Sequence, residues 1–201
     1  MKRAALKHPR VFDNSEWAEG YYKRNKKYIE QFGKKYAERL KTCGFRGGKI
    51  LDVGCGFGSM AVELGRACPT SQVMGIDLAD PLLDMANSLA EQAGLSDRVT
   101  FKKGDVQRID CDDDSVDVVL SAFMVHVVED PVAMLNEIER VLKPGGILLL
   151  CDLKRCWLGY FIPKFKTTLT LEEGKAVIGQ SKLRQGSYTE GFWWWGYEAG
   201  I

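Results

Sequence analysis

The sequence predicts an α/β fold in which a mostly parallel, doubly wound sheet of seven strands has helices on both faces. Three observations predict it: apolar runs alternate with amphipathic segments from Lys49 onward, several of those runs are unbroken, and a glycine-rich turn follows the first of them. Unbroken apolar strands are typical of parallel sheets that are buried on both faces. Strict alternation of strand and helix builds such sheets through right-handed crossovers, so we expect a Rossmann-like core.

The expected elements of the core follow one another in strict order. Strands are predicted over residues 50–53, 72–77, 99–102, 116–121 and 147–151. Helices are predicted over residues 59–67, 81–93 and 131–142. Pro81 in the first turn and Gly94 just past the end mark the second helix, because proline is favoured where helices start and glycine where they end.

Both flanks depart from this alternation. Residues 1–46 are expected to form an N-terminal helical cap of one or two amphipathic helices, ahead of a core over residues 47–201, within a single domain. After a helix over residues 171–183, extended segments at 186–190 and 192–199 lie close enough for a hairpin. The last strand is therefore expected to be antiparallel.

Two aromatic runs have no assigned role. Trp193–Trp195 falls in the expected last strand, where alternation sends Trp193 and Trp195 to one face and Trp194 to the other. Burial against helices is favoured for them over a dimer or substrate surface. Residues 157–165, with basic residues on both sides, are open to three interpretations: an apolar lid over the acceptor, a patch for a partner or membrane surface, or a loop buried in the core.

Composition excludes several classes of protein. The chain has 201 residues, 28 basic and 27 acidic, so its net charge of +1 gives no electrostatic case for nucleic acid as a partner. No apolar run approaches the roughly 18–20 residues of a membrane span, and the basic N-terminus lacks the apolar stretch of a secretory signal. Six cysteines without a Cys-x-x-Cys pair and two histidines exclude zinc-ligand spacing. We expect a cytoplasmic protein without a metal.

The glycine-rich turn points to a nucleotide-like ligand. Gly54, Gly56 and Gly58 follow the first strand at once, where glycine permits a sharp turn and lets a ligand approach the backbone. This is the carboxyl end of a strand, where open α/β sheets bind ligands. Asp77 closes the second strand about 20 residues on, where a carboxylate meets a ribose hydroxyl. An adenosine-containing ligand is indicated, but such turns serve NAD, FAD and S-adenosylmethionine enzymes alike.

Later motifs select among these ligands. They are Gly75-Ile76-Asp77, Gly104-Asp105, residues 117–121 and residues 142–146, in that order after the first motif at residues 50–58. In this set the chain resembles the class I S-adenosylmethionine-dependent methyltransferases with a type 11 methyltransferase domain, in particular the group of ubiquinone/menaquinone C-methyltransferases. The resemblance is good over residues 48–152 and loose in the flanks.

The resemblance implies a role for each matching residue. The residues that would hold the methionine part of the cofactor are Asp52, Gly54, Cys55, Gly56, Gly58 and, through its backbone, Ser121. The residues that would hold the adenosine part are Asp77 on the ribose hydroxyls, Leu78 against the adenine, and Gly104, Asp105 and Val106 around its amino group and ring.

Three further side chains complete the predicted site. His126, in the loop after the fourth strand, is the candidate general base, since an unperturbed imidazole has a pKa of about 6.5; the alternative is a purely local role in that loop. Many relatives carry a His-His pair there, but here Val127 follows, so no role can rest on a second histidine. Tyr21 and Tyr22 would close over the cofactor, with one of them touching its methionine carboxylate or its sulfonium, or would simply pack as part of an amphipathic helix.

The predicted function is methyl transfer from S-adenosyl-L-methionine to a small-molecule acceptor, apolar or aromatic in character. One alternative is a non-catalytic S-adenosylmethionine-binding protein. Another is an NAD-dependent oxidoreductase, which predicts a Gly-x-Gly-x-x-Gly turn, whereas Ser59 follows Gly58 here. A homodimer is compatible with the sequence.

Overall fold

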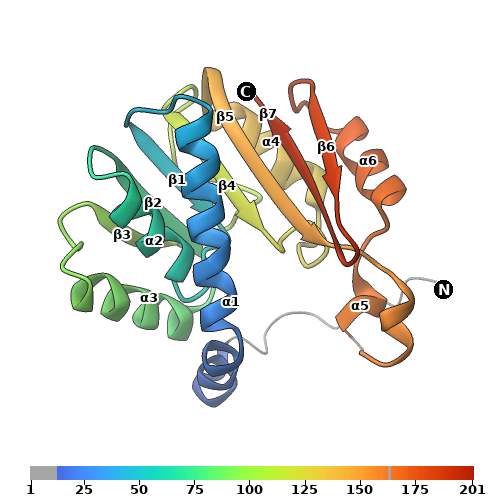
Figure 1. Ribbon diagram of the computed structural model, residues 1–201, viewed down its shortest axis with the longest axis horizontal. Coiled ribbons are helices and arrows are strands. Elements are labelled where there is room, and N and C mark those ends of the chain that lie inside the picture. The colour runs from blue at the N-terminus through green and yellow to red at the C-terminus, as the bar shows by residue number, and fades with distance from the viewer. Residues whose placement is uncertain (1–12, 163) are drawn as a thin grey trace.

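The computed structural model describes residues 13–162 and 164–201, which form a seven-stranded sheet in the order β3-β2-β1-β4-β5-β7-β6 (Figure 1). The strands are β1 (Lys49–Val53), β2 (Gln72–Asp77), β3 (Val99–Lys103), β4 (Val116–Ala122), β5 (Leu142–Leu153), β6 (Gly186–Glu190) and β7 (Trp194–Ala199). Strands β1 to β5 are parallel, whereas β7 runs antiparallel to both β5 and β6. The doubly wound fold and its antiparallel last strand are confirmed.

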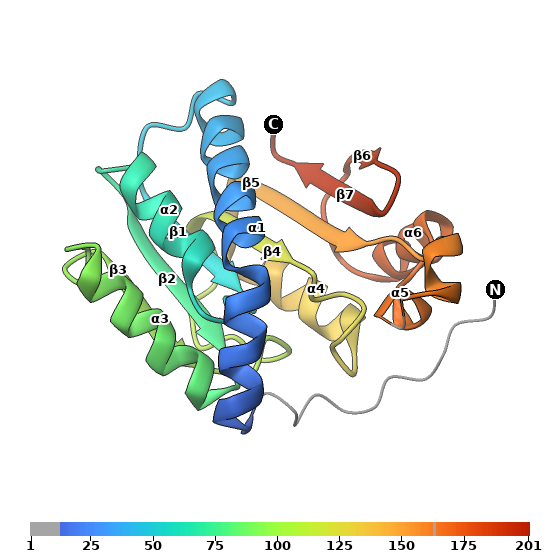
Figure 2. The ribbon, with the colours of Figure 1, turned by 60° about the horizontal axis from the view of Figure 1, so that its bottom comes forward.

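Helices cover both faces of the sheet (Figures 1 and 2). They are α1 (Ser15–Thr42), α2 (Ser59–Ala67), α3 (Asp80–Gln92), α4 (Pro131–Val141), α5 (Lys164–Thr167) and α6 (Leu171–Gln180), with a 3-10 turn, η2, at Trp157–Tyr160. Helices α1, α2 and α3 lie on one face, and α4 and α6 lie on the other. The second predicted core helix is thus α3, one residue earlier than expected at each end.

The described part of the predicted N-terminal cap, from residue 13 onward, contains one long helix; residues 1–12 of the cap lie outside the described residues. Asn14 begins α1 by accepting a hydrogen bond from the backbone of Trp17 at 2.9 Å, and Arg39 lies in the last turn, where a cation is favourable. Gly33 allows α1 to press against α2, because a Cβ there would lie 2.8 Å from the Cβ of Glu63. At about 1.5 Å per residue, its 28 residues reach from the far end of the sheet to the glycine-rich turn.

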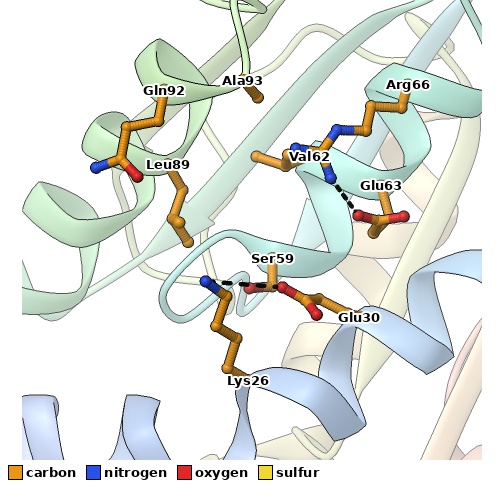
Figure 3. A pocket seen from close by; sticks show the side chains of 9 residues that line it. All are labelled: Lys26, Glu30, Ser59, Val62, Glu63, Arg66, Leu89, Gln92 and Ala93. Atoms are coloured by element: carbon orange, nitrogen blue, oxygen red, sulfur yellow. Dashed lines mark hydrogen bonds and ion pairs between the residues drawn. The ribbon is translucent and has the colours of Figure 1, made fainter.

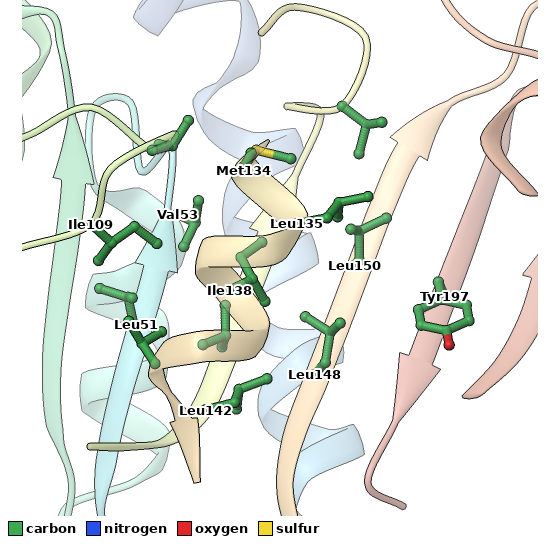
Figure 4. Packing of buried hydrophobic residues seen from close by; sticks show 14 of the residues in the cluster. Leu51, Val53, Ile109, Met134, Leu135, Ile138, Leu142, Leu148, Leu150 and Tyr197 are labelled. Atoms are coloured by element: carbon green, nitrogen blue, oxygen red, sulfur yellow. The ribbon is translucent and has the colours of Figure 1, made fainter. Parts of the chain in front are cut away.

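Apolar side chains of α4 fill the space between that helix and the sheet (Figure 4). Met134, Leu135 and Ile138 are fully buried against Leu51 and Leu148 of β1 and β5. Burying a leucine or isoleucine side chain contributes roughly 1.5–3 kcal/mol. This packing holds β1, β4 and β5 in one rigid layer, and their carboxyl ends carry most of the predicted site.

The tryptophan run departs from its prediction. Strand β7 begins at Trp194, so Trp193 belongs to the preceding turn, where the N–H of Gly191 donates to the carbonyl of Trp194 at 2.9 Å. Trp195 is fully buried in the cluster under α4 and α6. The ring of Trp193 instead lies 5.5 Å from that of Tyr28 on α1, on the opposite face. The prediction that both rings share a face was wrong, because strand alternation does not extend into a turn.

Candidate active site

The predicted site residues meet at the carboxyl edge of the sheet. In the strand register Asp52 lies beside Gly75 and Leu120, and Val53 lies beside Ile76. Ser121 is completely buried, and its hydroxyl donates to the carbonyl of Val53 at 3.4 Å. Residues distant in the sequence therefore line one edge, where ligands bind in open α/β sheets.

The glycine-rich turn is hydrogen-bonded to β2, and two of its three glycines are closely packed against neighbouring side chains. The N–H groups of Gly54 and Cys55 both donate to the carbonyl of Ile76, at 2.9 and 3.0 Å. Gly54, Gly56 and Gly58 all have positive φ, at 78°, 51° and 76°. A Cβ on Gly54 would collide with Met124, and one on Gly58 would lie 2.6 Å from the Cβ of Ala86.

Gly56 differs from its two neighbours. A Cβ added there meets no atom within 4 Å, so packing does not require a glycine at this position. Its N–H donates to Oδ2 of Asp77 at 2.9 Å, which ties the tip of the turn to the end of β2. The space over Gly56 is where a ligand can approach the backbone.

Asp77 is held by the backbone around it. Its Oδ1 accepts from the N–H of Ala79 at 3.0 Å, in addition to the bond from Gly56. Burial raises the pKa of Asp77, while the N–H groups of Ala79, Gly56 and Leu78 oppose that rise. The neighbouring Leu78 is a large apolar side chain left 55% exposed. A carboxylate beside an exposed apolar side chain suits a ribose and its base.

Asp52 is the most unusual group in the site. Its side chain is completely buried, and neither carboxylate oxygen has a hydrogen-bond partner among the described residues. Burial, together with the negative charge of Asp77, raises the pKa of Asp52 to about 8. A buried carboxyl without a partner is unfavourable unless a ligand compensates it. Asp52 therefore favours a ligand that carries a positive charge.

The loop after β3 brings the remaining residues that were predicted to hold adenosine to the same edge. The N–H of Gly104 donates to the carbonyl of Asp77 at 3.0 Å. Oδ1 of Asp105 accepts from the backbone N–H of Gln107 at 2.9 Å, and Val106 is buried. The end of β2 at Asp77 and the loop that carries Asp105 are thus joined directly by a hydrogen bond.

The first half of α1 lies over the glycine-rich turn. The rings of Tyr21 and Tyr22 pack edge-on against Phe57, with centroids 5.5 and 5.2 Å away. Burial and the charge of Asp77 raise the pKa of Tyr21 to about 12. Both tyrosines therefore lie beside the turn, and Tyr21 is close enough to Asp77 for the negative charge of that carboxylate to raise its pKa.

His126 is buried and paired with a residue that the sequence analysis missed. Its Nδ1 lies 2.5 Å from Oδ1 of Asp152, and its backbone N–H donates to Oδ2 of the same carboxylate at 2.8 Å. An aspartate that accepts from Nδ1 assigns the ring proton to that nitrogen, so Nε2 can take up a proton. The position of Asp152 near the carboxyl end of an unbroken apolar strand was the available sequence signal.

A second missed feature is an aromatic wall made of Tyr28, Phe32, Phe123 and Trp193. Tyr28 stacks on Phe123 with centroids 5.9 Å apart, and Phe32 meets Phe123 at 5.2 Å. Phe123 follows β4 directly and has φ +65°, a strained conformation for a large side chain that is often kept at functional sites. The wall joins α1, the loop after β4 and the turn before β7, so no single stretch of sequence reveals it.

A polar cavity of about 200 Å³ lies among α1, α2 and α3 (Figure 3). Its charged side chains pair within their own helices: Lys26 with Glu30 at 4.0 Å, and Arg66 with Glu63 at 2.5 Å. The lining is therefore neutral. It is separate from the carboxyl edge that carries Asp77 and Asp105.

Within the described ranges, no group of three or more His, Cys, Asp or Glu side chains could hold a metal ion. Nor does any helix of those same ranges have the length and apolar character needed to cross a membrane.

Comparison with known proteins decides the family. Residues 51–150 match the model of a methyltransferase domain. The chain belongs to this family. A similar curated protein, the demethylmenaquinone methyltransferase of Staphylococcus aureus (strain JH9), is 34% identical over 124 residues, which are 61% of this chain and 50% of the relative. The chain thus spans about half the length of the curated relatives it matches.

Solved structures agree on the fold of this methyltransferase domain. A protein of Methanococcus maripaludis assigned as an S-adenosyl-L-methionine-dependent methyltransferase aligns with a TM-score of 0.79 at 20% identity, covering 98% of this chain and 95% of that one. Geranyl diphosphate C-methyltransferase from Streptomyces coelicolor A3(2), solved with S-adenosyl-L-homocysteine, aligns with a TM-score of 0.64 at 20% identity, covering 78% and 60%.

Proposed function

We propose that this chain transfers the methyl group of S-adenosyl-L-methionine to a small-molecule acceptor. The observation that carries the proposal is the open space over Gly56, which lies beside two carboxyl groups, the fully buried and unpartnered Asp52 and the half-buried, backbone-held Asp77. A ligand with a positive charge and a ribose meets both needs. The methyltransferase family match over residues 51–150 supports the same assignment.

The cofactor would lie along the carboxyl edge of the sheet. Its methionine part would be held by Asp52, Gly54, Cys55, Gly56, Gly58 and the backbone of Ser121. Its adenosine part would be held by Asp77, Leu78, Gly104, Asp105 and Val106. Tyr21 and Tyr22 would cover it from α1, and burial of the exposed Leu78 side chain against the adenine would contribute to affinity.

The bound cofactor supplies a sulfonium-activated methyl group, so the protein's main task is to align the acceptor and exclude water. The aromatic wall offers flat apolar faces for an acceptor ring. His126 would take a proton from the acceptor through Nε2, while Asp152 holds the ring in place and stabilises the imidazolium that forms. The acceptor would therefore be a small, partly apolar molecule with an ionisable hydrogen.

Nucleic acid is not expected among the partners, since the net charge is only +1. The six cysteines are all free, as expected for a protein of the reducing cytoplasm. We treat the chain as a single domain in which residues 1–46 cap a core of residues 47–201.

Isothermal titration calorimetry tests the proposal directly. S-adenosylmethionine and S-adenosylhomocysteine should bind, and NADH should not. Tight binding of NADH without any response to S-adenosylhomocysteine would overturn the assignment. Turnover is then measured as S-adenosylhomocysteine release with a panel of phenolic and quinol acceptors, and binding without turnover on any acceptor would favour a non-catalytic protein.

A further inference from the structure

Two loops at the carboxyl edge expose a cluster of large apolar side chains. This aromatic patch comprises Trp157, Tyr160, Phe161, Ile162 and Phe192. The exposed fractions run from 39% for Ile162 to 76% for Phe161. They make up five of the eight exposed large hydrophobic residues in the described parts of the chain. The interpretation of residues 157–165 as a loop buried in the core was therefore wrong for Trp157, Tyr160, Phe161 and Ile162, whereas Phe165 is buried.

The patch is continuous across the two loops. The ring of Trp157 lies 6.1 Å from that of Phe161 and 6.2 Å from that of Phe192, edge-on in both contacts. The backbone N–H of Lys154 also donates to the carbonyl of Trp193 at 2.9 Å, which joins the loops at their base. Soluble monomers rarely leave contiguous apolar surface of this kind without a binding role.

Basic residues predominate in the segment that carries most of the patch. Residues 153–171 contain four basic residues and no acidic one, while the whole chain has a net charge of only +1, so the remaining residues together carry −3. Lys154 is paired with Glu190 at 2.8 Å, and Arg155 is paired with Glu173. Lys166 is exposed. The segment therefore has a positive surplus beside its exposed rings.

This combination identifies the partner by its chemistry. Exposed Trp, Tyr and Phe side chains are favoured at the bilayer–water interface, where the apolar ring contacts the acyl chains and any polar group contacts water or headgroups. Lysines beside them are attracted to anionic headgroups. A two-fold dimer through the patch would instead set the same basic segment of each copy against itself.

The patch leads inward to the aromatic wall. Phe192 lies in the patch, and the next residue, Trp193, contacts Tyr28 at 5.5 Å. Tyr28 in turn stacks on Phe123 at the end of β4. A row of aromatic side chains therefore connects the surface patch to the wall.

We propose that the aromatic patch docks on the surface of an anionic lipid bilayer and admits an apolar acceptor from the bilayer along Trp193. The docking itself depends only on the patch, whereas the second part rests on the proposed methyl transfer.

Vesicle co-sedimentation tests the docking independently of methyl transfer. The whole chain should pellet with phosphatidylglycerol–phosphatidylcholine vesicles, pellet far less with phosphatidylcholine alone, and lose binding as salt is raised. The double variant Phe161→Ser with Phe192→Ser should weaken binding tenfold or more. Lys166→Glu, which leaves every ring in place, should also weaken it, by about tenfold or more, since it reverses one charge.

Matched controls are Ile201→Ser, an exposed apolar side chain outside the patch, and Lys27→Glu, an exposed lysine on α1; both should bind vesicles as the parent chain does. All variants should bind S-adenosylhomocysteine normally, so a loss there would count against the cofactor site and not against docking. Failure of the parent chain to prefer anionic vesicles would overturn the docking proposal. So would a dimer in sedimentation that the double variant abolishes.

Discussion

Nδ1 of His126 lies 2.5 Å from Oδ1 of Asp152, and the backbone N–H of the same histidine donates to the other oxygen of that carboxylate at 2.8 Å. One side chain at the end of β5 therefore holds both the ring and the backbone of the loop after β4. Both residues are buried, so the ring is restrained in one orientation. This pairing is the arrangement that a positioned general base requires.

Replacing either partner should lower turnover without changing cofactor affinity. For an acceptor that must lose a proton, His126→Asn should lower kcat by about 10²–10⁴-fold. Asp152→Asn should also lower it, because the imidazole loses the carboxylate that fixes its Nδ1 proton and stabilises its charged form. Steady-state kinetics and S-adenosylhomocysteine calorimetry measure the two effects. Unchanged kcat in His126→Asn would exclude the histidine as the base.

Adding one methyl group at Gly56 should separate binding from folding. A Cβ there meets no protein atom within 4 Å, so Gly56→Ala costs only the strain of a positive φ, roughly 1–2 kcal/mol. The methyl group would nevertheless occupy the space that the cofactor needs. Gly44→Ala is the matched control, because Gly44 also has positive φ and open space around it. Gly44 precedes the amino end of β1, whereas the site lies at the carboxyl ends of the strands.

Both glycine variants should lose similar stability in urea denaturation, and only Gly56→Ala should lose S-adenosylhomocysteine binding. Equal affinity in the two variants would show that the ligand does not approach this turn.

Removing the carboxylate at the end of β2 should weaken binding of the cofactor. Asp77→Ala deletes a charge-assisted hydrogen bond of roughly 1.5–3 kcal/mol, which corresponds to about tenfold or more in Kd. Asp84→Ala on the exposed side of α3 is the control and should bind normally. Calorimetry with S-adenosylhomocysteine provides the measurement, and an unchanged Kd for Asp77→Ala would place the ribose elsewhere.

The raised pKa of Asp52 should make the ligand-free protein less stable as pH rises. Below about pH 4 the group is protonated in both folded and unfolded chains. Between about pH 4 and pH 8 the unfolded chain releases this proton and the folded chain keeps it, so the free energy of unfolding falls. Above about pH 8 the group adds no further slope.

Asp52→Asn should remove this contribution, so the free energy of unfolding of the variant should fall less than that of the parent between pH 4 and pH 8. Urea denaturation across that range gives the comparison. Parallel curves for the two proteins would mean that Asp52 titrates normally in the folded state.

Much of the fold could be predicted from local pattern. The unbroken apolar runs at β1, β2, β4 and β5 and the punctuation of α3 by Pro81 and Gly94 depend on neighbours in the sequence, so each was located to within a few residues. Strand β5 begins earlier than expected, at Leu142, because Leu142 pairs with Val116 across a register shift that local pattern does not reveal. Helix α6 ends at Gln180, three residues before its predicted end.

The meeting of the predicted cofactor residues at one edge also followed from sequence, because a glycine-rich turn and strand-ending aspartates have to lie at the carboxyl edge of a parallel sheet. Their role in holding the cofactor stays a prediction. The sequence by itself thus determined the family, the doubly wound sheet and the edge where a ligand approaches. The tertiary structure alone decided that Asp152 holds His126, that Trp193 turns toward Tyr28, and that the segment after β5 exposes its rings. Those contacts join residues 26 to 165 positions apart on separate elements, and packing, unlike periodicity, leaves no local trace in the sequence.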